Sequence, residues 1–287
     1  MMALSQPNSA AFDLNEALFN KITPMVNEDT GIQFLPEKRT LVQARISKRI
    51  RTLQIGSFEE YADFLNSPDG NAERKSLVSV LTTNVTRFFR ESHHFDHLRD
   101  EILPSLIQRA KNGGRVRLWS AGCSSGEEPY SIALTVLGLE RNIGDYDFKI
   151  LASDIDPEIV SKAQSGLYRD SALETVPSHL RKLYFKSDPS GGAGMSVASS
   201  DLKSIIAFRE LNLMHDWPFR GRFDVIFCRN VVIYLDSDTS ERIWARFANQ
   251  LEPNGMLYVG HSERVGNSDK VGLEPVGVTA YRNSGAR

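Results

Sequence analysis

The spacing of apolar residues along the chain changes near residue 80. Before that point, apolar side chains recur every three or four positions within 12–31, 36–56, 57–67 and 72–83, which is the period of amphipathic helices. Gly31 and Gly56 follow two of these stretches, and Ser57 with Glu60 has the spacing of a capping box. We therefore expect an all-α domain over residues 1–79.

After residue 80, short apolar runs alternate with amphipathic stretches. The runs that read as strands are 116–119, 148–154, 204–211, 223–229, 255–262 and 276–282. Strands that alternate with helices predict a mostly parallel sheet with helices on both faces. The expected fold of residues 80–287 is α/β and Rossmann-like, with a small Gly/Ser-rich β insertion at about 186–204.

Composition argues against a few classes of protein, namely nucleic-acid-binding, secreted and membrane-spanning proteins. The net charge of -2 argues against a surface built as a whole to hold nucleic acid. The first residues contain no basic segment followed by an apolar run, and no stretch approaches the ~20 apolar residues of a membrane span. We expect a cytoplasmic protein without membrane insertion, in which both cysteines are reduced thiols.

Candidate ligand residues follow the first two predicted strands. In open α/β sheets, ligands bind outside the carboxyl ends of the strands, where the strand order reverses. The first strand runs into the small residues of the loop 121–126, which allow close backbone approach to a ligand. The second ends at Asp154, the position of a carboxylate that binds ribose hydroxyls. Asp156 precedes Pro157 and a helix, and is better interpreted as an N-cap.

Two glutamates decide between cofactor classes. Glu127 and Glu128 follow the glycine loop directly, where they would repel the pyrophosphate of a dinucleotide. They favour a ligand with a cationic end, such as S-adenosylmethionine, which has no phosphate. Because adjacent helical side chains diverge, only one of them is expected to face the loop, and we choose Glu128. The alternative is that both only stabilise the helix dipole.

The fourth strand ends in Arg229 and Asn230 at the same edge. Methyltransferases that act on amino groups of bases usually carry an Asn or Asp with two prolines here, and ring-carbon methyltransferases use a Pro-Cys nucleophile. Cys228 follows Phe227 instead, and is better interpreted as a packed strand residue. Nucleic acid is therefore a poor substrate candidate.

Five segments together resemble the chemotaxis receptor methyltransferases, the CheR family, over most of the chain. They are TNVTRFFRESHHF (83–95), WSAGCSSGEEPYSIA (119–133), ASDID (152–156), FCRNVVIY (227–234) and GHSE (260–263). The resemblance implies a helical N-terminal domain joined to an S-adenosylmethionine-binding domain. It also implies conversion of glutamates of bacterial chemoreceptors into γ-glutamyl methyl esters, with S-adenosylhomocysteine as the second product.

The resemblance also implies a set of cofactor contacts. Asp154 takes the ribose, Asn212 and Leu213 flank the adenine, and the other contacts are Asn84, Thr86, Arg90, Glu128, Arg229 and Asn230. The positions of Glu128, Asp154, Arg229 and Asn230 at predicted strand ends point independently to the same four contacts. Asn84 and Thr86 rest on the resemblance alone, since either could be a helix cap. The chain departs from some relatives at 187–204, which lacks the Arg and Gly-Thr-Gly residues expected of an edge that docks a receptor tail.

The expected chemistry needs neither a base nor a metal. A free glutamate, with a pKa of about 4.3, is already ionised at neutral pH. Arg90 could hold either the cofactor carboxylate or the incoming glutamate, and Tyr234 is expected to line the methyl-transfer channel. His93, His94, Asp96 and His97 have partial ligand spacing, but no other cluster completes a metal site. His261 and Glu263 are expected to pack or hydrogen-bond near the site.

A basic helix at Lys38–Arg51 is the candidate contact with the receptor. Six basic residues against Glu37 leave an excess of five positive charges; the six are Lys38, Arg39, Arg45, Lys48, Arg49 and Arg51. Without the resemblance, this is a solvated helix face opposite the apolar stripe of Val42, Ile46, Ile50 and Leu53. With it, a basic face would guide the glutamate-rich helices of a receptor by charge.

Two other functions stay open. One is methyl transfer from the same cofactor to a small carboxylic acid or to nucleic acid. The other is a binding module that keeps the fold without catalysis, against which Asp154, Glu128 and the Arg229-Asn230 pair argue.

Overall fold

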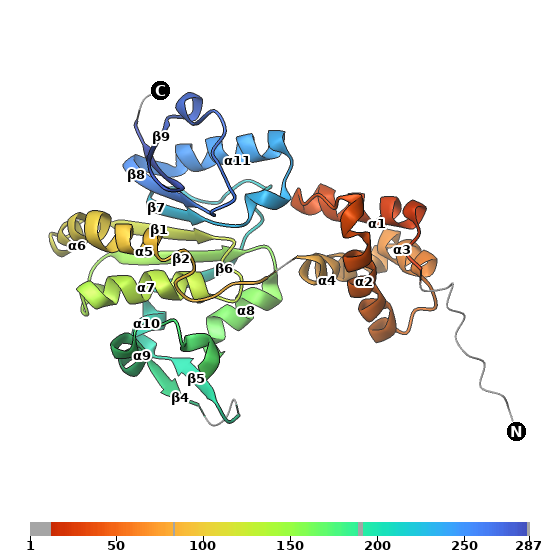
Figure 1. The fold of residues 1–287 in the computed structure, drawn as a ribbon, viewed down its shortest axis with the longest axis horizontal. Coiled ribbons are helices and arrows are strands. Elements are labelled where there is room, and N and C mark those ends of the chain that lie inside the picture. Colours follow the sequence, from red (N-terminus) through yellow and green to blue (C-terminus); the bar gives the residue numbers. More distant parts are fainter. Residues whose placement is uncertain (1–12, 83, 189–191, 286–287) are drawn as a thin grey trace, which may run out of the picture. The chain divides into compact units, whose positions relative to one another are not determined.

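The protein divides into two compact units, coloured along the chain in Figure 1. The structure is a computed structural model, and it describes residues 13–82, 84–188 and 192–285. The first unit is helical and ends before Asn84. It also includes the short segment Tyr234–Asp236 from much later in the chain. The second comprises Asn84–Ile233 and the chain from Ser237 on. The division falls slightly beyond residue 79, where the hydrophobic pattern changes.

The helical unit follows the amphipathic pattern closely. Its helices are α1 (Glu16–Thr30), η2 (Pro36–Lys38), α2 (Arg39–Leu53), α3 (Phe58–Asn66), η3 (Pro68–Gly70) and α4 (Asn71–Leu81). Gly31 ends α1 in the left-handed conformation, as predicted. The Ser57 side chain accepts a hydrogen bond from the Glu60 amide at 3.1 Å, as its capping-box spacing predicts. The end of α2 differs, because Gln54, with φ 58°, supplies the left-handed cap before Gly56 is reached.

One face of each helix forms the core of this unit. Val42, Ile46 and Ile50 of the predicted stripe on α2 are buried. The segment Tyr234–Asp236 of this unit adds a backbone pairing: Ile32 bridges Leu235 in antiparallel fashion, and the Gln33 amide donates to the Tyr234 carbonyl at 2.8 Å. The helical unit is therefore completed by residues from far along the chain.

The second unit is built on a seven-stranded sheet in the order β6-β2-β1-β7-β8-β10-β9. Its strands are β1 (Val116–Ala121), β2 (Phe148–Asp154), β6 (Ile206–Glu210), β7 (Phe223–Cys228), β8 (Leu251–Val259), β9 (Leu273–Gly277) and β10 (Ala280–Asn283). The pairings from β6 to β8 are parallel, and β10 is antiparallel to both of its neighbours. From β1 the chain continues to β2 on one side and returns later to β7 on the other. The strand order thus reverses between β1 and β7, which is where such sheets bind ligands.

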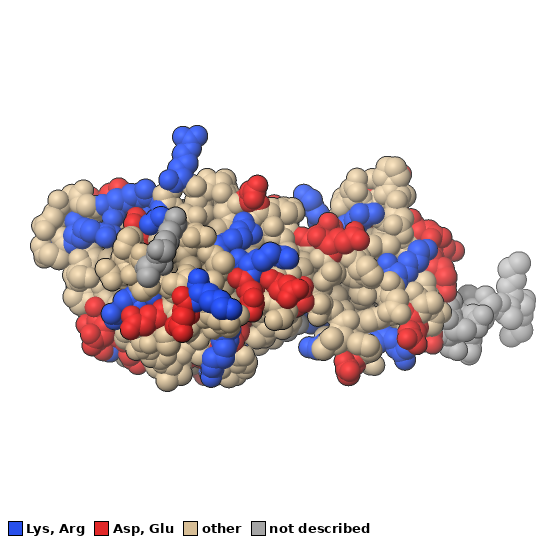
Figure 2. Space-filling model, turned by 90° about the horizontal axis from the view of Figure 1, so that it is seen from above, with Lys and Arg blue, Asp and Glu red and all other residues tan. Residues whose placement is uncertain are grey.

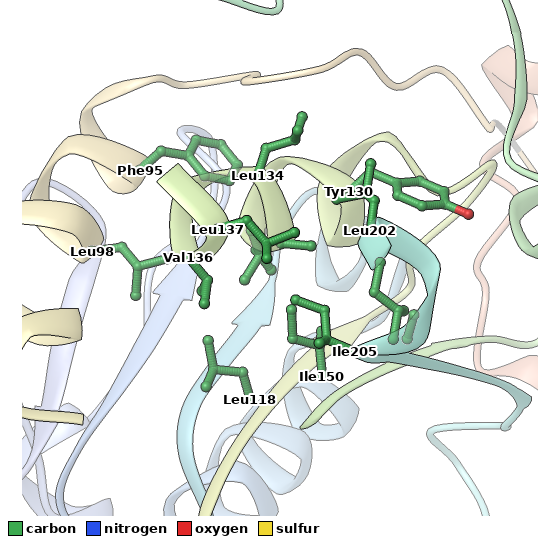
Figure 3. Close-up of a cluster of buried hydrophobic side chains, with 14 of the residues drawn as sticks. Phe95, Leu98, Leu118, Tyr130, Leu134, Val136, Leu137, Ile150, Leu202 and Ile205 are labelled. Carbon is green, nitrogen blue, oxygen red and sulfur yellow. The ribbon is translucent and has the colours of Figure 1, made fainter. Parts of the chain in front are cut away.

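Helices cover both faces of this sheet, as the alternation predicts. The helical segments along this part of the chain are α5 (His93–His97), η4 (Leu98–Ile102), α6 (Leu103–Lys111), α7 (Glu127–Leu139), η5 (Ile143–Asp145), α8 (Pro157–Ser165), α10 (Ser200–Ser204), η8 (Val232–Tyr234), α11 (Ser237–Gln250) and η9 (Ser268–Val271), and Tyr234 at the end of η8 belongs to the first unit. Leu118 of β1 joins the cluster with Tyr130, Leu134 and Leu137 of α7 (Figure 3). Its neighbour Trp119 takes the opposite face, because successive strand residues alternate.

The insertion is a small antiparallel sheet in the order β3-β5-β4. Its elements are β3 (Leu167–Arg169), η6 (Asp170–Leu173), α9 (Ser178–Tyr184), β4 (Phe185–Ser187) and β5 (Met195–Ala198). It begins well before residue 186, because β3 pairs with β5 across the intervening helix. Residues 189–191 of the expected insertion lie outside the described residues. At the end of the chain, the single strand expected at 276–282 is a hairpin of β9 and β10, turning at Thr279 with φ 52°.

Charged side chains of both signs are interspersed on the face shown in Figure 2, in keeping with the net charge of -2. Among the residues that the structure describes, no helix is long and apolar enough to cross a membrane.

Candidate active site

The loop after β1 brings the backbone against the end of β2. The Ser124 amide donates to Oδ2 of Asp154 at 2.8 Å, and the amides of Gly122 and Cys123 both donate to the Ser153 carbonyl. Gly122 has φ +77°, and a Cβ placed on it would lie 2.3 Å from Cγ2 of Val231. Only glycine therefore lets the loop pass the end of β7.

Asp154 is the carboxylate at the centre of this loop. It is buried, and its Oδ1 accepts a second hydrogen bond from the Asp156 amide at 3.1 Å. Burial raises the pKa of Asp154, while the backbone hydrogen bonds from Ser124 and Asp156 oppose that shift. Asp156 accepts from the amides of Glu158 and Ile159, which confirms it as the N-cap of α8.

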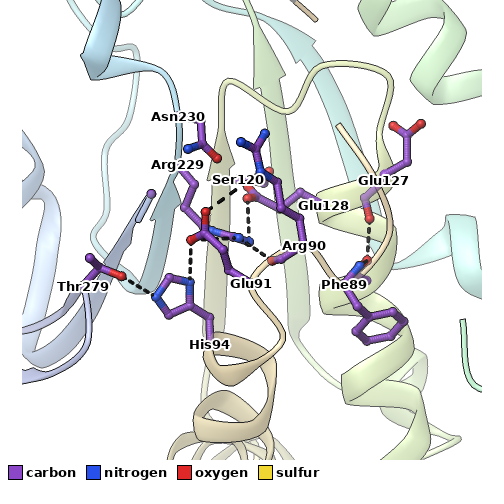
Figure 4. A network of polar contacts seen from close by, with 12 residues as sticks. Phe89, Arg90, Glu91, His94, Ser120, Glu127, Glu128, Arg229, Asn230 and Thr279 are labelled. Carbon is purple, nitrogen blue, oxygen red and sulfur yellow. Dashed lines mark hydrogen bonds and ion pairs between the residues drawn. The ribbon is translucent and has the colours of Figure 1, made fainter. Parts of the chain in front are cut away.

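Glu128 and Glu127 point to different partners. Oε1 of Glu128 accepts from the Ser120 hydroxyl at 2.7 Å, and Oε2 lies 3.3 Å from Nη1 of Arg229 (Figure 4). Oε2 of Glu127 instead accepts from the Ser125 hydroxyl at 2.6 Å. Burial raises the pKa of Glu128, and Arg229 acts in the opposite direction. Glu128 is thus the glutamate that faces the end of β7.

Arg229 joins three segments from a fully buried position at the end of β7. Its Nη2 lies 3.2 Å from Oε2 of Glu91 and also donates to the Arg90 carbonyl, while its Nη1 reaches Glu128. Its guanidinium also lies 5.6 Å from the ring centroid of Phe95. Arg229 is therefore a hub that fixes the chain around Arg90 against the sheet, as Figure 4 shows.

The segment that precedes α5 runs along this edge of the sheet. Oγ of Ser124 donates to the Asn84 carbonyl at 3.1 Å, and Nδ2 of Asn84 lies 3.5 Å from Oδ2 of Asp156. Thr86 is half-buried in the following stretch. Further on, the Phe89 amide donates to Oγ of Ser131 at 2.9 Å. Arg90 remains 30% exposed, donating from Nη1 to the Val85 carbonyl, so its side chain is accessible to a ligand.

Glu263 shapes the loop that carries Asn230. Its buried carboxylate accepts four backbone hydrogen bonds at 2.6–3.1 Å, and the donors are Gly260, Asn230, Val231 and Ile233. These bonds accompany a left-handed backbone at Asn230, with φ 59°. Burial raises the pKa of Glu263, and its backbone hydrogen bonds oppose that shift.

The charges of this edge favour a cationic ligand. Four carboxylates (Glu91, Glu128, Asp154 and Glu263) stand against two guanidiniums (Arg90 and Arg229), which leaves an excess of two negative charges when all are ionised. Oδ1 of Asn230 is buried and has no hydrogen-bond partner among the described residues. A buried acceptor of this kind needs a donor, which the ammonium of an amino-acid ligand can supply.

The loop after β6 begins beside Asp154. The Leu211 amide donates to the Asp154 carbonyl at 2.9 Å, and the next two residues, Asn212 and Leu213, are half-buried. The two strand ends therefore place Asn212 and Leu213 close to the carboxylate expected to bind ribose.

Two family models match the chain. The model described as "CheR methyltransferase, SAM binding domain" matches residues 84–281, and "CheR methyltransferase, all-alpha domain" matches residues 17–82. The chain belongs to the CheR methyltransferase family. It is therefore a methyltransferase that uses S-adenosylmethionine and acts in chemotaxis, and the resemblance identified from its sequence is confirmed.

Relatives of this CheR-family chain match over nearly its whole length. A protein of Rhizobium etli named "Probable chemotaxis protein methyltransferase" is 54% identical over 90% of this chain and 96% of its own length. "Chemotaxis protein methyltransferase 2" of Pseudomonas aeruginosa is 39% identical over 92% and 91%. "Chemotaxis protein methyltransferase" of Salmonella typhimurium is 38% identical over 88% and 86%.

The CheR-family site brings together most of the predicted residues within the second unit. Asn84, Glu128, Asp154, Arg229 and Asn230 lie at the carboxyl edge of the sheet, with Arg90, Asn212 and Leu213 on adjoining loops. Their roles toward the cofactor stay predictions, as does that of Thr86. Tyr234 ends η8 and belongs to the segment that completes the helical unit, so its role also stays a prediction.

Two contributors to this CheR-family site go beyond what the sequence predicts: Glu91 is missed, and Glu263 is expected only to pack or hydrogen-bond nearby. Glu91 binds Arg229 and accepts from both the amide and Nδ1 of His261, and its neighbour Arg229 lowers its pKa although burial acts in the opposite direction. Glu263 organises the loop after β7. Their signal was faint: both stand inside segments that carry the resemblance, next to Arg90 and within GHSE.

The histidines expected to form only a partial metal site have other partners. Nε2 of His94 lies 2.9 Å from the Thr279 hydroxyl, and Nδ1 of His97 lies 2.7 Å from the Tyr258 hydroxyl. Within the described ranges, no group of three or more His, Cys, Asp or Glu residues is placed to hold a metal ion. Cys228 is buried in β7, which fits its interpretation as a packed strand residue.

Proposed function

We propose that this protein transfers the methyl group of S-adenosylmethionine to glutamate side chains of bacterial chemoreceptors in the cytoplasm. The products are γ-glutamyl methyl esters and S-adenosylhomocysteine. The observation that carries the proposal is the cluster of buried carboxylates around Arg229 and Asp154, at the point where the strand order reverses. Its negative excess suits a cationic cofactor, and the relatives' names supply the link to chemotaxis.

S-adenosylmethionine, when bound, supplies an electrophilic methyl carbon on a sulfonium. Asp154 would accept hydrogen bonds from the ribose through lone pairs that its two backbone donors leave free. Asn230 would accept from the ammonium through its buried Oδ1. Glu128 would stabilise the positive end of the ligand by its charge, at a distance set by Ser120 and Arg229.

The substrate step needs no proton transfer and no metal. An ionised glutamate oxygen forms a bond to the methyl carbon while the carbon–sulfur bond breaks and its electron pair returns to sulfur. Arg90, whose guanidinium is accessible, would hold a carboxylate in two-point fashion, and Tyr234 would line the channel. The chain contributes alignment and exclusion of water, which can lower a barrier by roughly 7–11 kcal/mol in favourable cases.

The exposed part of the basic helix would guide the receptor. Lys38, Arg39, Lys48 and Arg51 are exposed, whereas Arg45 and Arg49 bind groups within the helical unit. Docking of a receptor tail on 187–204 is not part of the proposal, because the residues expected of such an edge are absent from that stretch.

The test is methyl transfer from labelled S-adenosylmethionine to membranes that carry chemoreceptors, followed by mild base. Carboxyl methyl esters release labelled methanol, whereas N-methyl and C-methyl products do not. We expect base-labile label on the receptor with the native protein and little with Asp154→Asn. Base-stable label, or label only on a small carboxylic acid or nucleic acid, would refute the receptor ester. Absence of S-adenosylhomocysteine binding at millimolar concentration would refute the enzyme altogether.

A further inference from the structure

The loop after β6 is held by a residue from a distant helix. Arg246 of α11 donates from Nη1 to the Leu213 carbonyl and from Nη2 to the His215 carbonyl. Its Cζ lies 4.0 Å from the ring centroid of Trp217, which is the geometry of a close cation–π contact. One guanidinium thus binds three residues of a five-residue stretch.

Trp217 reinforces the same point of the loop. Its indole Nε1 donates to the Leu213 carbonyl at 3.3 Å, so that carbonyl accepts from two side chains. The ring packs on Phe247 of α11 with centroids 5.0 Å apart and meets Trp119 of β1 edge-on at 4.9 Å. Trp217 is therefore anchored to both the sheet and α11, and Arg246 is stacked on an immobile ring.

The first residues of the loop are fixed as well. The Leu211 amide is bonded to the Asp154 carbonyl, and Oδ1 of Asn212 accepts from the Met214 amide at 2.9 Å. The contacts of Arg246 thus immobilise a loop backbone that begins beside Asp154.

We propose that Arg246 is a positioning residue that sets the selectivity of this protein for the adenine ring of its cofactor. It acts through the backbone carbonyl of Leu213, which it holds in place. The inference rests on the proposed placement of the adenine between Asn212 and Leu213. Arg246 itself does not touch the reacting atoms, so its loss weakens recognition of the base and leaves the transfer step intact.

The experiment compares Arg246→Met with wild type and with Arg242→Ala. Arg242 is the matched control, because it stands one turn earlier on α11, is exposed, and donates from Nη2 to the Thr239 hydroxyl at 2.8 Å. Calorimetry would measure the Kd of S-adenosylhomocysteine and of its deaminated analogue S-inosylhomocysteine, which differs only in the base. Steady-state assays would measure KM for S-adenosylmethionine and kcat.

For Arg246→Met we expect Kd and KM to rise about tenfold, the equivalent of about 1.4 kcal/mol, with kcat within about twofold of wild type. The preference for the adenine-containing ligand should fall by a similar factor. Arg246→Lys should restore little of it, because an ammonium lacks the planar fork and the stacking surface. An effect confined to thermal stability, with the ratio of the two Kd values unchanged, would overturn the inference.

A second variant separates this inference from the placement on which it rests. Leu213→Ala removes an apolar contact to the base without touching Arg246. If Leu213→Ala weakens S-adenosylhomocysteine binding and Arg246→Met does not, the inference about Arg246 is wrong and the placement stands. If neither variant changes the Kd while wild type binds tightly, the adenine lies elsewhere.

Discussion

Glu263 shows how one side chain can determine a loop at the ligand edge. Oε2 accepts from the amides of Asn230 and Gly260, and Oε1 from those of Val231 and Ile233. No amide side chain can replace this arrangement, because an amide has only one oxygen. The left-handed backbone of Asn230 therefore depends on a carboxylate 33 residues away along the chain.

We predict that Glu263→Gln destabilises the second unit and weakens cofactor binding together. The NH₂ group of glutamine would face two backbone donors, and each lost hydrogen bond to a charged acceptor is worth about 1.5–3 kcal/mol. Chemical denaturation should show a lower free energy of unfolding, and calorimetry a raised Kd for S-adenosylhomocysteine. Glu274→Gln, on the exposed face of β9, is the control and should leave both unchanged. Normal binding by Glu263→Gln would show that Asn230 does not need this anchor.

His94 makes stability depend on pH. It is 1% exposed, and burial, with a further contribution from Arg229, lowers its pKa from 6.5 to about 3. Between these values the unfolded chain binds a proton that the folded chain does not. The free energy of unfolding therefore falls as pH falls, by up to about 1.4 kcal/mol per pH unit from this group.

The measurement is urea denaturation between pH 7 and pH 5 for wild type and His94→Gln. The pKa of Asp154, Glu128 and Glu263 is raised, which gives these carboxyl groups the opposite pH dependence, so the difference between the two proteins isolates His94. We expect a shallower pH dependence for His94→Gln, and no such change for the exposed His179→Gln. Parallel curves would contradict the buried, neutral state of His94.

Residues differ in how far the sequence can predict them. Asp154 and Glu128 follow strand ends, and strand ends can be found from apolar runs, so their place at the ligand edge could be predicted. Glu91 and Arg246 could not be found this way, and Glu263 could be expected only to pack or hydrogen-bond near the site. Each acts on a backbone group or side chain that is distant in sequence. The hydrophobic pattern does not reveal such long-range partners of polar residues on turns and helices.

At the scale of elements, helix α2 carries two kinds of basic residue. Nε and Nη2 of Arg49 each lie 2.7 Å from an oxygen of Glu73, whose side chain is 5% exposed and also accepts from the Tyr61 hydroxyl. Arg45 donates to the carbonyls of Leu81 and Thr82 at the end of α4. These two arginines stabilise the helical unit, so the predicted basic face consists of fewer side chains than its sequence indicates.

We predict that Arg49→Met lowers the free energy of unfolding of the helical unit by about 2–3 kcal/mol, because it leaves a buried carboxylate with Tyr61 as a weaker partner. This is below the cost of breaking a fully buried pair, since Arg49 keeps 26% exposure. Thermal denaturation followed by circular dichroism would measure it. Glu73→Gln combined with Arg49→Met should recover part of the loss. An unchanged unfolding midpoint in Arg49→Met would mean that the Arg49–Glu73 pair stabilises the helical unit no more than a surface ion pair does.

For the exposed face of α2, we predict that Lys48→Glu slows receptor methylation several-fold at low salt, because a steering charge raises the rate of association. The dependence of the methylation rate on salt should also weaken, since salt screens that charge. The Kd of S-adenosylhomocysteine should not change. Lys75→Glu is charge-matched and lies on α4 of the same unit. Equal methylation rates for the two variants at every ionic strength would show that the basic face of α2 is only solvated and does not guide the receptor.

The prediction of elements was good where a pattern was long and poor where it was short. The parallel strands and the capped helices of the first unit follow from periods of two and 3.6 residues. The pattern does not separate β9 from β10, because their turn is at Thr279 rather than at an obvious glycine pair. The apolar spacing predicts no element over α5 and α6, because Pro104 interrupts it.

At the scale of the whole molecule, the chain passes between the two units three times. It leaves the helical unit before Asn84, returns at Tyr234, and leaves again at Ser237. The Gln33 amide depends on that return, since it donates to the Tyr234 carbonyl.

We predict that hydrogen exchange at Gln33 reports this dependence. Its amide should be protected in the full chain and should exchange rapidly in a fragment that ends at residue 82. The Ile50 amide, inside α2, is the internal control and should stay protected in both if the fragment folds. Protection of Gln33 in the fragment would mean that another acceptor replaces Tyr234.

The same return has a consequence for how this gene can change. The two units are encoded as interleaved rather than consecutive stretches, because codons for Tyr234–Asp236 lie inside the reading frame of the second unit. A single recombination near codon 83 would therefore transfer an incomplete helical unit and leave its three-residue complement behind. The units are expected to be inherited together and to accumulate compensating substitutions, although each folds around its own core.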